Sequence, residues 1–232
     1  MGGVIVALDF PTGSRAIEFL DQFRDQKLFV KVGMELYYAE GPEIVAAIKA
    51  RGHRLFLDLK LHDIPNTVMR AMAVLLRLGV DMVNVHAAGT GEMMAAALRG
   101  LSGGQTKPLL IAVTQLTSTT EDAMRRELLI DMPMERTVLH YARNAMAAGL
   151  DGVVCSPLEA AAVKAACGPQ FLAITPGVRF EGGDAGDLAR VMTPARAREA
   201  GSDFIVMGRP ITAAADPAAA YRRATAEFAG TI

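Results

Sequence analysis

Short apolar runs recur along the whole chain, and this repetition is the feature that most limits what it can fold into. Eight runs are flanked by turn-forming or polar residues: 4–10, 28–33, 54–60, 82–87, 109–116, 152–156, 171–177 and 203–208. Most are continuously apolar instead of alternating, which is typical of strands covered on both faces in a parallel sheet. The pattern therefore predicts eight parallel strands.

Helix patterns lie between these runs. They cover 14–26 with Ser14 as the expected N-cap, 65–79, 134–149, 158–168, 193–201 and 216–230 with Asp216 at its start and Gly230 at its end. A capping residue first and a glycine last is the usual order at helix ends. Eight strand-then-helix units in 232 residues favour an α/β fold of the (β/α)8 TIM-barrel type, which takes about 250 residues. An open doubly wound sheet is the alternative.

No linker, charge block or low-complexity segment divides the chain, so residues 1–232 are expected to form a single domain. Two connections, 117–133 and 178–192, are long enough to suggest functional loops, and the second, with three glycines in 178–192, is expected to form a mobile lid.

The net charge of −1 and the two cysteines exclude several classes of protein. A nucleic-acid binder would carry a basic face. Cys155 and Cys167 are too few for a disulfide framework and suit a reducing cytoplasm; Cys155 is expected in the core. The first ten residues lack the basic region of a signal peptide and are interpreted as a strand. The apolar runs are too short to span a membrane.

Polar residues gather where the predicted strands end, and in a (β/α)8 barrel the active site lies at the C-terminal ends of the strands. They are Asp9, Lys31, Asp58, Lys60, Asn84, His86, Thr117, Arg179 and Arg209. Asp58 and Lys60 are the strongest case, because they interrupt an apolar strand and their spacing of two places them on one face. Buried charges are costly unless paired, so the pair is either a structural ion pair or part of a site.

The functional interpretation gains from two further charges, Asp63 just beyond this strand and Lys31 on the neighbouring one. Two acids alternating with two bases predict one charged array, in which the carboxylates keep Lys60 protonated despite partial burial. Lys60 would then be a ready proton donor. His62 and His140 lack metal-ligand spacing, and no Gly-rich nucleotide loop or dinucleotide fingerprint stands out. We therefore expect no metal and no cofactor.

A phosphate site is predicted from two glycine–arginine segments, TPGVR (175–179) and GRP (208–210). The loops after strands 7 and 8 are the usual phosphate site of this barrel. Backbone near Gly177 and Gly208 allows close approach of an anion, and Arg179 and Arg209 each offer a planar fork of donors. Two ordinary glycine turns with solvent-facing arginines are the alternative.

These residues match a known family. The chain resembles bacterial orotidine 5′-phosphate decarboxylases from end to end, through VALDF (6–10), VKVGMEL (30–36), DLKLHDIPNTV (58–68), AVTQLTS (112–118), TPGVR (175–179), RVMTP (190–194) and MGRPIT (207–212). The resemblance implies a homodimeric barrel with shared active sites that converts orotidine 5′-monophosphate to UMP and CO₂ in pyrimidine biosynthesis, without a cofactor.

The same resemblance implies a role for each matching residue. Lys60 is the proton donor to C6 of the pyrimidine, Asp58 lies beside the substrate carboxylate, and Lys31 links the array to the ribose. The remaining contacts are Asp9 to the ribose hydroxyls, Thr117 and Ser118 to the pyrimidine, Arg179, Gly208 and Arg209 to the phosphate, and Asp63, Ile64 and Thr67 to the site of the partner subunit.

One position departs from the family pattern. Where the family has glutamine in the lid, this chain has Leu188, which cannot form that glutamine's bridge between phosphate and pyrimidine. We expect retained activity with weaker binding or lid closure. Other interpretations stay open: an Mg²⁺-dependent sugar-phosphate decarboxylase or aldolase on the same barrel, a Schiff-base aldolase using Lys60, and a non-catalytic binder of a phosphate ligand.

Overall fold

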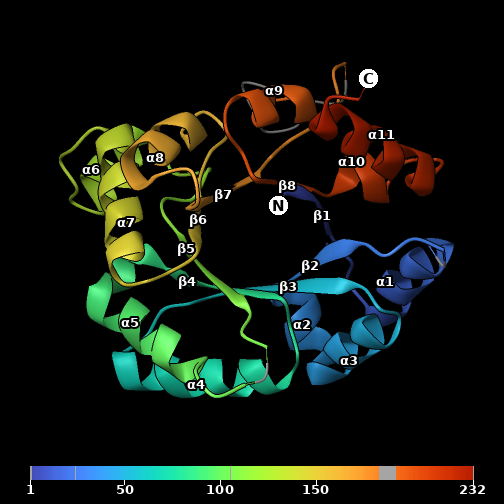
Figure 1. Cartoon of the computed structure of the whole chain (residues 1–232), viewed down its shortest axis with the longest axis horizontal. Helices are drawn as coiled ribbons and strands as arrows, with labels where there is room; N and C mark the ends of the chain where they lie inside the picture. The colour runs from blue at the N-terminus through green and yellow to red at the C-terminus, as the bar shows by residue number, and fades with distance from the viewer. Residues whose placement is uncertain (1, 24, 105, 183–191, 232) are drawn as a thin grey trace.

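The computed structural model describes residues 2–23, 25–104, 106–182 and 192–231. Eight parallel strands follow one another around a closed barrel in sequence order, surrounded by helices (Figure 1). They are β1 (Gly3–Ala7), β2 (Phe29–Gly33), β3 (Arg54–Leu61), β4 (Met82–His86), β5 (Leu109–Val113), β6 (Gly152–Val154), β7 (Leu172–Pro176) and β8 (Phe204–Met207). Every predicted strand is present, so the (β/α)8 barrel is confirmed and the open sheet is wrong.

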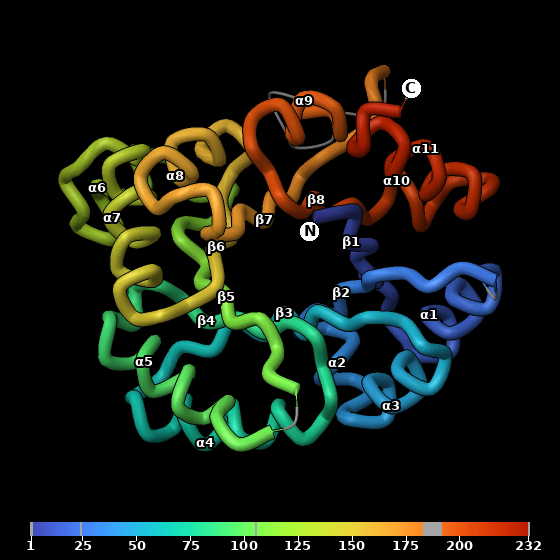
Figure 2. Tube along the Cα trace, viewed as in Figure 1, coloured from blue at the N-terminus to red at the C-terminus, as the bar shows by residue number. Residues whose placement is uncertain are grey.

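The barrel closes where the last strand pairs with the first, with Val6 opposite Met207. The chain runs once around the barrel, so that the C-terminal helix α11 (Pro217–Ala229) lies beside β1 (Figure 2). The predicted ends of α11 are confirmed: Asp216 accepts the N–H of Ala219 at 2.8 Å, and Gly230 adopts a left-handed φ of 73°.

The other helices include all those predicted and several more. They are α1 (Gly13–Leu20), α2 (Met34–Glu40), α3 (Pro42–Ala50), α4 (Pro65–Arg77), α5 (Thr90–Gly100), α6 (Glu121–Glu127), α7 (Met134–Ala147), α8 (Ala160–Cys167), α9 (Pro194–Glu199) and α10 (Arg209–Thr212), with 3-10 turns η1 (Asp21–Phe23) and η2 (Ala87–Gly89). In the described part of the chain, no helix has both the length and the apolar character needed to cross a membrane.

Two local predictions are corrected. The N-cap of α1 is Thr12, whose extended backbone precedes the helix, and Ser14 lies inside the helix. The connection 117–133 is not a plain loop, because it contains α6, capped by the Thr120 hydroxyl. In the second long connection, Val178 pairs with Met192. Residues 183–191, including the expected lid position Leu188, lie outside the described residues.

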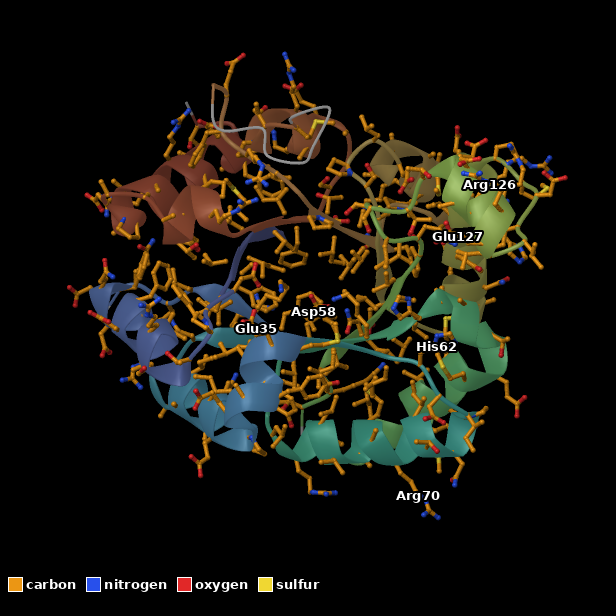
Figure 3. The ribbon with its side chains drawn as sticks, turned by 180° about the vertical axis from the view of Figure 1, so that it is seen from behind. Glu35, Asp58, His62, Arg70, Arg126 and Glu127 are labelled. Atoms are coloured by element: carbon orange, nitrogen blue, oxygen red, sulfur yellow. The ribbon has the colours of Figure 1, made fainter. Side chains whose placement is uncertain are left out.

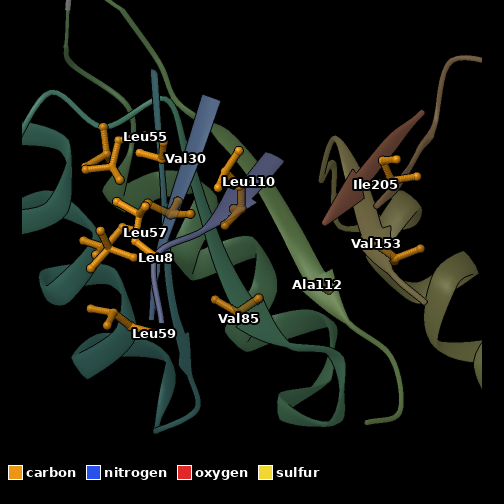
Figure 4. Packing of buried hydrophobic residues seen from close by; sticks show 14 of the residues in the cluster. Leu8, Val30, Leu55, Leu57, Leu59, Val85, Leu110, Ala112, Val153 and Ile205 are labelled. Carbon is orange, nitrogen blue, oxygen red and sulfur yellow. The ribbon is translucent and has the colours of Figure 1, made fainter. Parts of the chain in front are cut away.

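Alternation along each strand separates two apolar layers. On β3, Leu55, Leu57 and Leu59 pack in the outer layer between the strands and the helices (Figure 4). The inward positions form a separate cluster inside the barrel, made of Ile5, Ala7, Phe29, Phe56, Met82, Ile111, Ile174, Phe204 and Val206. This is the two-residue period expected of strands that are buried on both faces.

The N-terminal end of the barrel is filled by aromatic side chains from strand starts. Phe29 and Phe204 meet edge to face with ring centroids 5.7 Å apart, and the Arg54 guanidinium lies 4.2 Å from the Phe29 ring centroid. Because the barrel interior is packed at this end, the inward positions at the opposite, C-terminal end are the ones left for polar groups.

Candidate active site

The site is built from the inward positions that follow the apolar layer. Lys31 comes two residues after Phe29 on β2, Asp58 two residues after Phe56 on β3, and Asn84 two residues after Met82 on β4. A spacing of two keeps each polar group on the face of its apolar predecessor. Adjacent strands therefore bring these groups together near the barrel axis, where Figure 3 shows Asp58.

The carboxylate of Asp58 is the centre of a charged array. Its Oδ1 accepts hydrogen bonds from Lys60 Nζ and from Asn84 Nδ2, each at 2.7 Å. Its Oδ2 lies 3.3 Å from Lys31 Nζ, which in turn lies 3.4 Å from Asp9 Oδ1. Asp58 is only 8% exposed, so its charge is held by these partners and not by water.

The electrostatics of the array favour an ionised Asp58. Burial alone would raise the pKa of this carboxyl, but the charges of Lys31 and Lys60 and the hydrogen bonds from Lys60 and Asn84 outweigh burial and lower the pKa below its ordinary value. Close by, burial lowers the pKa of His86, aided by His62 and Lys60 and opposed by Asp58. His86 is thus a neutral imidazole beside the array at neutral pH.

Lys60 reaches this position through an unusual backbone conformation. Its φ is 52°, in the left-handed region that residues other than glycine rarely adopt. The pairing of β3 with β4 shifts register between Leu57 and Leu61, and the Lys60 N–H donates to Asn84 Oδ1 at 2.8 Å. Backbone strain of this kind is concentrated at functional sites.

A cavity of about 260 Å³ opens beside the array. Charged groups of Lys31, Asp58 and Lys60 line it, together with the segment 115–118 after β5 and apolar side chains of the barrel interior: Phe56, Val113, Val154, Ile174, Pro176 and Val206. Thr117 and Ser118 therefore line the cavity, while their contact with a pyrimidine stays a prediction, and Gln115 and Leu116 are lining residues that sequence reasoning missed. Charges beside an apolar wall interact more strongly than charges in water.

The predicted phosphate residues occupy the loops after β7 and β8. Arg179 is half-buried, and within the described residues its Nε is a buried donor without a hydrogen-bond partner. Gly208 lies beside the array, since a Cβ there would be 3.4 Å from Asp9 Oδ2. Arg209 starts α10 and is exposed. Among the described residues, these loops thus offer an anion the buried Nε of Arg179, which has no partner there, and the exposed guanidinium of Arg209.

Asp63, Ile64 and Thr67 do not join the cavity of their own chain. All three are exposed around the start of α4, and Ile64 is 66% exposed. Asp63 Oδ1 instead accepts the N–H of Ile64 at 2.6 Å. Within one chain, the expected array therefore contains Lys31, Asp58 and Lys60, while Asp9 occupies its outer end and Asp63 lies outside it.

Two other expectations concern groups away from the array. Cys155 is buried in the core as predicted, and burial raises the pKa of its thiol, which makes it a poor nucleophile. Among the residues that the structure describes, no three side chains of His, Cys, Asp or Glu converge in a way that suits a metal ion.

Fold and site together define a class: a (β/α)8 barrel with an enzyme-type site at the carboxyl ends of its strands. Comparison with known proteins narrows it. The family model of orotidine 5′-phosphate decarboxylase / HUMPS matches residues 2–224. Curated orotidine 5′-phosphate decarboxylases from Geobacillus thermodenitrificans and Streptococcus pyogenes are each 57% identical, over 97% of this chain and 96% and 97% of their own lengths.

Solved structures agree with this. The orotidine 5′-phosphate decarboxylase of Lactobacillus acidophilus superposes with a TM-score of 0.87 at 41% identity, over 98% of this chain and 99% of that one. An uncharacterized conserved protein from Geobacillus kaustophilus has a TM-score of 0.88 at 53% identity, over 97% and 99% of the two chains. The chain belongs to the orotidine 5′-phosphate decarboxylase / HUMPS family, and it is an enzyme.

Proposed function

We propose that this chain decarboxylates orotidine 5′-monophosphate to UMP and CO₂, a step of pyrimidine biosynthesis, without a cofactor. The observation that carries the proposal is the Asp58 carboxylate, held ionised between Lys31 and Lys60 on the wall of the cavity. The identity of 57% to orotidine 5′-phosphate decarboxylases over nearly the whole chain supports the choice of substrate.

In the proposed reaction, the bond between C6 and the carboxylate breaks, CO₂ leaves, and the electron pair stays on C6. Asp58 faces the substrate carboxylate and disfavours its charge. The Lys60 ammonium stabilises the developing carbanion and then donates its proton to C6, and solvent returns a proton to the amine. In many enzymes, fixed charges at the place where charge develops make the largest contribution to the rate enhancement. Here Asp58 holds the Lys60 ammonium at 2.7 Å.

Other residues on the cavity wall and in the neighbouring loops would bind the rest of the substrate. Thr117 and Ser118 on the cavity wall suit the pyrimidine. Asp9, paired with Lys31, suits the ribose hydroxyls. The unused Nε of Arg179, the exposed guanidinium of Arg209 and the backbone of Gly208 suit the phosphate. Phosphate binding far from C6 contributes energy that can be realised in the transition state.

We further propose a homodimer in which Asp63, Ile64 and Thr67 enter the site of the partner subunit. Supporting this, the three residues are exposed at the start of α4 and do not line their own cavity. Ile64, which is 66% exposed beside the exposed Asp63, offers an apolar contact to a partner next to a charged one. The enzyme would work in the cytoplasm, with neither nucleic acid nor membrane as a partner.

An Mg²⁺-dependent sugar-phosphate decarboxylase or aldolase on the same barrel is the rival. In this chain, both oxygens of Asp58 are already engaged by Lys31, Lys60 and Asn84, so ammonium and amide groups occupy the place where a cation would approach. The test follows the loss of orotidine 5′-monophosphate absorbance with and without a chelator. Turnover that survives the chelator supports the proposal. Binding without turnover, or turnover that the chelator abolishes, contradicts it.

A further inference from the structure

Asn84 is buried in the barrel wall and connects two members of the charged array. It is 1% exposed on β4. Its amide group donates to Asp58 Oδ1 at 2.7 Å, and its amide oxygen accepts the backbone N–H of Lys60 at 2.8 Å. The Asn84 side chain therefore fixes two groups on the neighbouring strand β3: the carboxylate of Asp58 and the backbone of Lys60, two residues later.

The bond to the Lys60 backbone lies where the sheet is irregular. Between Leu57 and Leu61 the pairing of β3 with β4 shifts register, and Lys60 has a φ of 52°. A partly buried N–H that loses its partner strand needs another acceptor, because an unsatisfied buried donor is costly. Asn84 supplies that acceptor from the neighbouring strand and so stabilises a conformation that lysine otherwise avoids.

The bond to Asp58 acts on the electrostatics of the array. Hydrogen bonding from Asn84 is one of the influences that lower the pKa of Asp58 against the effect of burial. The charged and titratable groups around this carboxylate are Lys31 on β2, with Asp9 beyond it after β1, Lys60 on β3, and His86 on β4. Asn84 does not titrate, and it bonds directly to the carboxylate.

We propose that Asn84 is a positioning residue for catalysis, which holds the Lys60 ammonium toward the cavity and the Asp58 carboxylate in its place. This rests on the roles proposed above for Lys60 and Asp58. Asn84 does not line the cavity, so its effect passes through these two residues and not through contact with substrate. Its loss should lower kcat while leaving KM nearly unchanged.

Three variants test the proposal. Asn84→Ala removes both bonds. Asn84→Asp keeps an acceptor for the Lys60 N–H but replaces the donor with a second carboxylate, and its similar shape protects the fold. Thr137→Val is the matched control: Thr137 is 6% exposed on α7 and donates to the Pro133 carbonyl at 3.2 Å, remote from the array. For each, kcat and KM on orotidine 5′-monophosphate, the pH profile of kcat/KM and the melting temperature are measured.

We expect Asn84→Ala to lower kcat by roughly 10- to 100-fold, the effect of a lost hydrogen bond to a charged group. Without the Asn84 donor, the pKa of Asp58 rises, so the acid limb of the profile moves to higher pH. Asn84→Asp should move that limb further because it adds negative charge. Thr137→Val should change neither kcat nor the profile, whatever its effect on melting.

The outcomes separate this inference from the proposed function. If both Asn84 variants keep a wild-type kcat and acid limb while Lys60→Ala is inactive, the positioning role is wrong and the role of Lys60 stands. If Lys60→Ala itself retains substantial turnover, the proposed mechanism is wrong. The positioning role is also contradicted if the Asn84 variants melt at a lower temperature but, like Thr137→Val, keep an unchanged kcat and pH profile.

Discussion

The Lys60 ammonium donates a hydrogen bond of 2.7 Å to the carboxylate of Asp58, which lies two residues earlier on the same strand, β3. Two alternate residues of a regular strand lie about 7 Å apart along its axis, so the contact needs the long lysine side chain to fold back toward its neighbour. The pair is therefore formed by two residues of one strand. A site whose charges are arranged in advance avoids reorganisation during the reaction.

Replacement of Lys60 by alanine should remove nearly all turnover and leave the fold intact. General acid catalysis typically contributes about 10²- to 10⁴-fold, and Lys60 also stabilises the carbanion, so the loss should reach at least the upper part of that range. The side chain is 25% exposed at a strand end, which limits the structural effect. Circular dichroism checks that the fold is intact, and the absorbance assay checks the loss of turnover. Substantial residual decarboxylation would refute the assigned role.

Replacement of Arg209 or Arg179 by alanine should raise KM by roughly 10- to 100-fold, because each removes charged donors from the phosphate. The decisive measurement compares orotidine 5′-monophosphate with orotidine, which has no phosphate. On orotidine the two variants should match the unmodified enzyme. Arg99→Ala, at an exposed position on α5, is the control. Equal losses on both substrates would show that these arginines act elsewhere.

Mixing two inactive variants tests the shared site. Lys60→Ala and Asp63→Ala should each be inactive alone, because every site of a homodimer then lacks one group. A mixed dimer has one site with neither group and one with both, so random exchange of subunits should restore about a quarter of the normal activity. Size-exclusion chromatography confirms the dimer. A mixture no more active than its components would mean that Asp63 acts within its own chain or not at all.

Leu188→Gln should increase kcat/KM, because the family resemblance implies that a glutamine at this position bridges phosphate and pyrimidine. The gain should be modest, about that of one or two hydrogen bonds, and should vanish on orotidine. Leu158→Gln changes an exposed leucine before α8 in the same way and should have no effect. An unchanged kcat/KM in Leu188→Gln would contradict the role assigned to this position.

The free energy of unfolding should decrease as the pH is lowered, because the fold disfavours protonation of the buried His53. The Nδ1 atom of His53 accepts the N–H of Leu28 at 3.1 Å. Burial, with Lys27 and Arg51, lowers the pKa of His53. The unfolded chain, with a histidine pKa of about 6.5, then binds more protons, and the free energy of unfolding decreases as pH drops through this value. Urea denaturation at about pH 7.5 and pH 5.5 should show a smaller decrease in the free energy of unfolding between these two pH values for His53→Gln than for wild type, and an equal decrease in both proteins would contradict the role of His53.

Sequence alone located the eight strands because covered parallel strands leave continuously apolar runs, and it located the polar groups because barrels carry them at strand ends. The sequence pointed to Asp58, Lys60 and Lys31 because these charged residues lie at the ends of predicted strands. Strand alternation then brought these residues together as expected. What depends only on chain order and the two-residue period was therefore predictable.

Other parts of the site depend on backbone detail that a sequence pattern does not carry. The left-handed φ of Lys60 and the register shift beside it break the regular alternation. The double role of Asn84 follows from that irregularity; the sequence marks Asn84 only as a polar residue at a strand end, and no pattern predicts its two bonds. Nearness in sequence predicts Asp63 in the array, yet at the start of α4 its side chain is exposed and accepts the Ile64 N–H.

The conformation of Lys60 also matters for anyone who engineers this barrel. A left-handed residue other than glycine costs about 1 kcal/mol or more, so a design method that scores stability alone will favour glycine at position 60. That change would relieve the backbone strain and at the same time remove the proposed proton donor. Thermostable versions of this enzyme are better sought in its outer helices, where the trade-off between robustness and catalysis does not arise.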